Sequence, residues 1–168
     1  HLAAEGLPEL PRHDLPAESV AGHSWGVAWL VLNLLPADLD RGRALTYALL
    51  HDLPEVRTGD LTPHDGVAPA DKAAREAAAL DAMTAPLPRG DALAAAWHAY
   101  EAQADAEARF VRQCDRLDMA LQAVAYARAH GVDTTEFLDS AAPVTTHPAL
   151  RPLFLACRDR LSHRRGAS

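Results

Sequence analysis

Apolar residues recur every three or four positions along most of the chain, the spacing that gathers them on one face of an α-helix. The pattern is clear between Ser19 and Pro36, where one face carries Val20, Val27, Leu30 and Leu34. We therefore predict a first helix that starts near Ser19 and stops before Pro36, because the proline ring cannot continue it. No stretch alternates apolar and polar residues over the length of a strand, so the pattern predicts helices throughout.

The rest of the chain divides into further helices separated by prolines and glycines. Asp40 is predicted to cap a second helix that ends at Pro54, and residues 53–69 read as an irregular loop, which at that length in a compact domain is usually functional. Five more helices are predicted near residues 71–83, 91–103, 105–131, 135–140 and 147–161, with Asp91 as a cap and Gly131 as a stop. The prediction is one all-α domain over residues 1–168, a bundle of six or seven helices with an irregular segment at 1–17 and a frayed tail at 162–168.

Composition narrows the class of protein. Apolar residues make up 49% of the chain and aromatic residues only 5%, as in packed helices rich in Ala and Leu. The net charge of −7 argues against a polynucleotide partner, because such binding depends on a cationic surface. No apolar run reaches the length of about 18 residues that a membrane helix needs. We expect Cys114 and Cys157 to be buried thiols in a cytoplasmic protein.

Polar residues that can bind metals stand at three places where helical periodicity calls for an apolar one. His23 follows Val20 by three positions and precedes Val27 by four. His51, joined by Asp52, ends the apolar face of the second predicted helix. Asp115 lies in the long predicted helix, four residues from an apolar side chain on either side. A carboxylate directed into a helical bundle is costly unless it is paired or coordinates a metal.

Taken together, these side chains predict one metal site. His23, His51, Asp52 and Asp115 offer two imidazoles and two carboxylates from three helices, a mixed set that suits one divalent ion such as Mn, Fe, Co, Ni, Zn or Mg. Four protein ligands leave coordination positions for water and a substrate oxygen, the arrangement by which such ions promote hydrolysis. Taken singly, each histidine could be a hydrogen-bonded core residue.

The same residues resemble the metal motif of the HD-domain phosphohydrolase superfamily. Longer strings in the same order are similar to the branch that contains the HD-domain 5′-deoxynucleotidases: ESVAGHSW at 18–25, HDLPEVRTGDLTPHDG at 51–66, YEAQADAEARFVRQCDRLDMALQA at 100–123 and EFLDS at 136–140. The resemblance implies an HD-type helical fold, the four metal ligands named above, and hydrolysis of nucleoside 5′-monophosphates to nucleoside and phosphate. It also implies a homodimer.

The resemblance assigns roles to two acids in the predicted loop. Glu55 matches a catalytic acid of the family, and Asp60 matches a position that contacts the sugar and is needed for activity. Which of them handles which proton stays open. On the residues alone, Glu55 could be a solvated loop carboxylate and Asp60 a turn cap.

Other polar and aromatic residues have two readings. Lys72 and Arg75 are candidate phosphate-binding residues, or they form ion pairs with Asp71 and Glu76 on a solvent-exposed helix face. Arg116 and Asp118 are expected to support the ligands from the same helix as Asp115. Trp25 and Trp29 are expected in the core rather than as a shelf for a base.

The chain departs from the family pattern at two places, and this leaves more than one function open. Gly22 stands where the family usually carries an acid, and the segment from Arg12 to Pro16 is short and lacks a tryptophan that favours the 2′-deoxy sugar. Ribo- and deoxyribonucleotides therefore both remain candidate substrates. The alternatives are a phosphatase for another small phosphoester and a non-catalytic, metal-stabilised module that binds a nucleotide or a partner.

Overall fold

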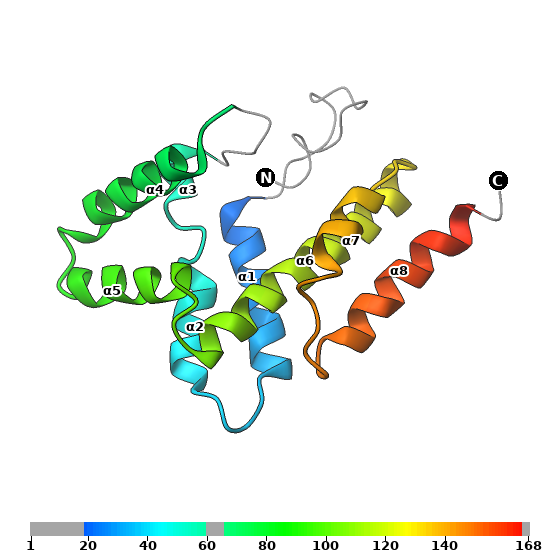
Figure 1. The fold of residues 1–168 in the computed structure, drawn as a ribbon, viewed down its shortest axis with the longest axis horizontal. Helices are drawn as coiled ribbons and strands as arrows, with labels where there is room; N and C mark the ends of the chain where they lie inside the picture. Colours follow the sequence, from blue (N-terminus) through cyan, green and yellow to red (C-terminus); the bar gives the residue numbers. More distant parts are fainter. Residues whose placement is uncertain (1–18, 60–65, 166–168) are drawn as a thin grey trace.

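In the computed structural model, which describes residues 19–59 and 66–165, helices pack on both sides of one long helix, α6 (Figure 1). In chain order the helices are α1 (Val20–Leu34), α2 (Arg41–Leu50), α3 (Glu55–Thr58), α4 (Pro69–Thr84), α5 (Gly90–Glu101), α6 (Ala106–His130), α7 (Thr135–Ala141) and α8 (Arg151–Arg165). Apart from the four-residue α3, every helix has seven residues or more, and no strand occurs in the described ranges. The predicted all-α fold is confirmed, with seven longer helices and one additional turn.

Side-chain caps explain where the three helices of the bundle centre begin. Ser19 accepts a hydrogen bond from the amide of Gly22 at 3.0 Å and starts α1. Asp40 caps α2, and Asp105 caps α6 by accepting from the amide of Ala108 at 2.8 Å. Gly131 ends α6 with a φ of 73°, a left-handed conformation that glycine adopts without strain. The predicted ends of these helices were close to the observed ones.

Three predicted boundaries were wrong. The expected loop contains α3, because Pro54 occupies the cap position, where a proline is tolerated. Asp91 does not cap α5; the helix begins one residue earlier at Gly90, where a Cβ would lie 2.1 Å from the carbonyl oxygen of Thr84. The last helix starts at Arg151 rather than at 147, and it continues past 162 to Arg165.

The main core lies where α1 and α2 cross α6, and it extends along α6 to α7 and α8 (Figure 1). Val27, Val31 and Leu117 are completely buried there, as is Cys114, while Cys157 is 2% exposed. Both cysteines are therefore buried free thiols, as predicted. In the part of the chain that the structure describes, no helix is both long enough and apolar enough to cross a lipid bilayer.

A smaller apolar cluster connects α4 and α5 to the end of α2. It consists of Leu50, Leu80 and Trp97 with partly buried neighbours. This cluster matters for the site, because it anchors the C-terminal end of α2, where His51 and Asp52 follow the helix.

Trp25 and Trp29 are exposed, so their predicted place in the core was wrong. Their side chains are 66% and 53% exposed, and the two rings stack with centroids 5.9 Å apart and planes 4° from parallel. The reason is helical geometry, since each lies two residues before a buried valine, Val27 or Val31, and two residues turn a helix by about 200°. The tryptophans therefore face solvent on the side of α1 opposite the core.

Candidate metal centre

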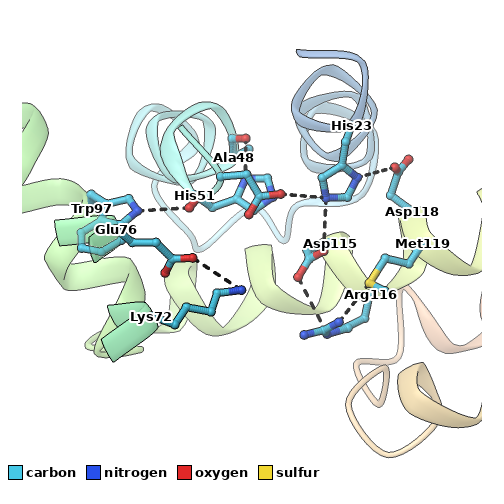
Figure 2. Close-up of polar contacts among 11 residues, drawn as sticks. His23, Ala48, His51, Lys72, Glu76, Trp97, Asp115, Arg116, Asp118 and Met119 are labelled. Atoms are coloured by element: carbon cyan, nitrogen blue, oxygen red, sulfur yellow. Dashed lines mark hydrogen bonds and ion pairs between the residues drawn. The ribbon is translucent and has the colours of Figure 1, made fainter. Parts of the chain in front are cut away.

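His23 lies at the end of the first turn of α1 and is held from both sides. The residue is 6% exposed, and its Nδ1 lies 2.9 Å from Oδ2 of Asp118 on α6. Its Nε2 lies 3.3 Å from Oδ1 of Asp115 and 3.5 Å from Oδ2 of Asp52 (Figure 2). Because α1 and α6 pack in the same core, the histidine brings together carboxylates that are far apart in the sequence.

His51 directly follows α2 and is 5% exposed. Its Nδ1 lies 2.9 Å from the carbonyl oxygen of Ala48, and its Nε2 lies 3.3 Å from Oδ2 of Asp52. The ring also packs edge-on against His23 and Tyr100, with centroids 5.2 and 5.7 Å away. These contacts fix the orientation of the imidazole.

The two carboxylates of the cluster remain reachable from solvent. The side chain of Asp52 is 28% exposed and that of Asp115 is 14% exposed. The second oxygen of Asp115 lies 3.8 Å from Nε of Arg116, which confirms that Arg116 supports this carboxylate. The cluster is therefore in contact with solvent on the side of the carboxylates.

The hydrogen bonds of the two histidines show that the cluster fits a cation. A carbonyl or a carboxylate oxygen accepts hydrogen bonds, so each Nδ1 donates and each neutral ring keeps its lone pair on Nε2. Both Nε2 lone pairs then face carboxylate oxygens, and the buried Nε2 of His51 has no hydrogen-bond partner among the described residues. Acceptors that face acceptors repel one another unless a metal ion or a proton lies between them.

The distances suit a metal ion. Donor atoms of His23, His51 and Asp52 all lie within 4.8 Å of one another. Two ligands about 2.1 Å from one ion and at 90–110° to each other are about 3.0–3.4 Å apart, close to the 3.3 and 3.5 Å observed here. Asp118 orients His23 through its Nδ1, the carboxylate–histidine arrangement common behind metal ligands.

Without an ion, protons take its place at the cluster. Burial lowers the pKa of His23, but the hydrogen-bonded carboxylates of Asp115 and Asp118 outweigh burial and raise it to about 10. The pKa of His51 is likewise raised, since Asp52 outweighs the effect of burial. Burial raises the pKa of Asp52, but the charges of His51, His23 and Lys72 bring it below its usual value.

We therefore predict that metal binding releases protons. His23 is protonated below pH 10 in the ion-free protein and must be neutral to bind a metal through Nε2. Binding should release about one proton from this residue, so the affinity should rise at least about tenfold per pH unit between pH 7 and 9, and more steeply where His51, whose pKa is also raised, releases a proton too. Titration calorimetry of Mn²⁺ binding in buffers of different ionisation enthalpy measures the proton count. A binding heat that does not depend on the buffer would contradict the prediction.

The two predicted catalytic acids follow the HD pair, His51 and Asp52, in the chain. Glu55 is the first residue of α3, half-buried, and its amide donates to the carbonyl oxygen of Asp52 at 3.0 Å. This places it one turn after Asp52. Asp60 lies outside the described residues, immediately after Gly59, which ends α3 with a φ of 70°.

The predicted phosphate-binding residues lie on α4. Nζ of Lys72 is 3.4 Å from Oε1 of Glu76, one of the pairings expected from the sequence. The Lys72 side chain is 35% exposed, and Figure 2 shows the ion pair between Lys72 and Glu76 next to the histidine cluster. Arg75 is exposed on the same helix. Of the two cations, Lys72 is the one whose charge reaches Asp52.

Trp97 was not predicted to belong to the site, yet its side chain holds the backbone of His51 in place. Its Nε1 donates to the carbonyl oxygen of His51 at 3.1 Å, and the residue is 3% exposed (Figure 2). Carbonyls at a helix C-terminus lack partners within the helix. The indole supplies one, which fixes the backbone between His51 and Asp52.

The fold and the cluster define an all-α protein with a mixed histidine–aspartate site for a divalent metal ion. The chain belongs to the HD domain family, whose model matches residues 9–151.

Individual relatives agree with this assignment. The chain is 35% identical over 137 residues to the 5′-deoxynucleotidase HDDC2 of Bos taurus, covering 79% of this chain and 67% of the relative. It is 27% identical over 139 residues to the 5′-deoxynucleotidase YGK1 of Saccharomyces cerevisiae, covering 78% and 65%.

Two solved structures share the fold. A protein of Magnetospirillum magnetotacticum described as a predicted metal-dependent phosphohydrolase superposes with a TM-score of 0.65 at 30% identity, over 87% of this chain and 78% of the other. A Pyrococcus horikoshii protein superposes with a TM-score of 0.72 at 25% identity, over 87% and 86%.

Proposed function

We propose that this protein is a divalent-metal-dependent phosphohydrolase that converts nucleoside 5′-monophosphates to nucleoside and phosphate. The observation that carries the proposal is that Nε2 of both histidines faces the carboxylate of Asp52, while Nε2 of His23 also faces that of Asp115. The 5′-deoxynucleotidases among its relatives support the choice of a nucleotide. The resemblance implies a homodimer, and the two buried thiols are typical of a cytoplasmic protein; both features are part of the proposal.

In the proposed reaction, His23, His51, Asp52 and Asp115 hold the ion. A divalent ion there supplies Lewis acidity, which polarises the phosphoryl group and makes a water molecule easier to deprotonate. Asp118 and the Ala48 carbonyl keep both imidazoles in the tautomer that ligation requires.

The protein side chains manage the protons and the phosphate charge. Water adds to phosphorus as the bond to the ribose 5′-oxygen breaks, so one proton leaves the water and one reaches the departing oxygen. We assign these transfers to Glu55 and Asp60, and contact with the sugar to Asp60. Lys72 and Arg75 on α4 are assigned to the phosphate.

Hydrolysis by metal-defined protein tests the proposal. Protein stripped by a chelator is reloaded with Mn²⁺, Co²⁺ or Zn²⁺ and given ribo- and deoxyribonucleoside 5′-monophosphates together with sugar phosphates. Phosphate release should need the metal and should be fastest with nucleotides. Faster release from sugar phosphates would favour the alternative substrate class. Metal binding without hydrolysis of any of these esters would favour a non-catalytic binding module.

Lys72 provides a separate prediction about the phosphate. Replacing it with methionine should raise KM for a nucleoside monophosphate about 10- to 100-fold, because a charge-assisted contact contributes about 1.5–3 kcal/mol and each 1.4 kcal/mol is tenfold. The companion variant is Arg75→Met, for which a smaller rise in KM is expected because Arg75 is exposed on the same helix. Steady-state kinetics at saturating metal measure both variants. An equal or larger rise in KM for Arg75→Met would make Arg75, rather than Lys72, the stronger of the two phosphate contacts.

A further inference from the structure

Gly26 lies in α1, one turn after His23, where the helix meets α6. A Cβ built on this glycine would lie 2.4 Å from Oδ1 of Asp118, 2.9 Å from its Cγ and 3.1 Å from its Oδ2. Carbon and oxygen atoms that are not bonded do not approach to 2.4 Å without a shift. The carboxylate of Asp118 therefore occupies the space that a side chain at position 26 would fill.

The carboxylate cannot give way without a loss at His23. Oδ2 of Asp118 lies 2.9 Å from Nδ1 of His23, and its side chain is only 7% exposed. If the carboxylate turned aside, the histidine would lose its acceptor, and at 8% exposure its side chain is poorly placed to hydrogen-bond with solvent instead. If α1 moved instead, it would separate from α6 in a core where Val27 and Leu117 are fully buried.

We propose that Gly26 is a positioning residue for the metal centre. Its missing side chain allows Asp118 to orient His23, and this orientation sets the affinity of the cluster for a divalent ion. The inference rests on the metal site of the proposed function. It also explains why α1 contains a glycine in its interior, where alanine is the better helix former.

The substitution Gly26→Ala separates this role from a general effect on the helix. A purely helical role predicts a more stable protein with unchanged metal affinity, because alanine favours the helix. The proposal predicts that Mn²⁺ affinity, measured by calorimetry, falls about 10- to 100-fold, the usual range for losing a partner behind a metal ligand. The matched control is Gly42→Ala in α2, nine residues before His51 and thus about 13 Å away along the helix. It should bind Mn²⁺ like the unaltered protein.

A double-mutant cycle with Asp118→Ala tests whether the two residues act together. Asp118→Ala alone should weaken Mn²⁺ binding, and adding Gly26→Ala should then change nothing further, because the clash has been removed. If Gly26→Ala does not fold, the double variant should fold, since alanine at 118 leaves room. The proposal is overturned if the two substitutions lower the Mn²⁺ affinity independently, so that the loss in the double variant is the product of the two single losses. An unchanged affinity in Gly26→Ala, or a double variant that also fails to fold, overturns it as well.

The result also distinguishes this inference from the proposed function. If the unaltered protein binds no divalent ion, the metal site itself is wrong. If it binds an ion and Gly26→Ala binds it equally well, only the role of Gly26 is wrong.

Discussion

Replacing Asp115 with alanine should lower kcat for nucleoside monophosphate hydrolysis at least about 10³-fold, because the metal contributes several kcal/mol and each 1.4 kcal/mol is tenfold in rate. Oδ1 of Asp115 lies 3.3 Å from the Nε2 of His23 that is proposed to bind the ion. Its removal takes away both a ligand and a negative charge. Phosphate release and metal content of the purified variant, measured together, check the prediction.

The control for Asp115→Ala is Asp139→Ala, which removes an exposed aspartate from α7. It should keep both turnover and bound metal. A variant at position 115 that retains the metal and turns over at more than a tenth of the original rate would show that Asp115 is not a ligand.

Glu55→Gln should leave metal affinity nearly unchanged and lower kcat about 10²- to 10⁴-fold, the usual contribution of a positioned proton-transfer group. Glutamine has the shape of glutamate, but its side chain can neither take up the proton of the water nor give one to the departing oxygen. The residue begins α3 one turn after Asp52, so the substitution leaves the proposed ligands in place. Calorimetry with Mn²⁺ and single-turnover kinetics separate binding from chemistry.

Glu136→Gln is a matched control for Glu55→Gln, because Glu136 is also an acid in the first turn of a short helix. It should have no effect on kcat. Equal activity of Glu55→Gln and the unaltered protein would leave proton transfer to Asp60 or to the solvent, and the assignment of Glu55 would be wrong.

The main helices could be predicted from the sequence because their ends are determined locally. Ser19, Asp40 and Asp105 each accept a hydrogen bond from an amide three residues later, and Gly131 adopts a left-handed conformation. These contacts involve neighbours in the chain, so residue type alone indicates them. The start of α5 at Gly90 could not be predicted in this way. There the backbone of Gly90 lies close to the carbonyl oxygen of Thr84, a contact that depends on how α4 and α5 pack.

The four proposed ligands could also be found, since a histidine or an aspartate in an apolar stripe stands out. The partners that orient them were less accessible. Asp118 could be suspected from its place one turn after Asp115, but the indole hydrogen bond from Trp97 to the His51 carbonyl joins residues 46 positions apart. The space left by Gly26 has no pattern at all in the sequence, because it depends on the distance between α1 and α6. The prediction that Trp25 and Trp29 lie in the core was wrong, because the size and apolarity of a side chain do not determine which face of a helix it occupies.

The stacked pair of Trp25 and Trp29 affects how the protein can be studied by fluorescence. Two of the three tryptophans lie at the surface, whereas Trp97 is buried against the backbone of His51. Two of the three indoles that contribute to the intrinsic fluorescence are therefore in a polar surrounding, on the outer side of α1. With phenylalanine at 25 and 29, the remaining emission would come from one chromophore attached to the HD pair, an optical reporter of events at that centre.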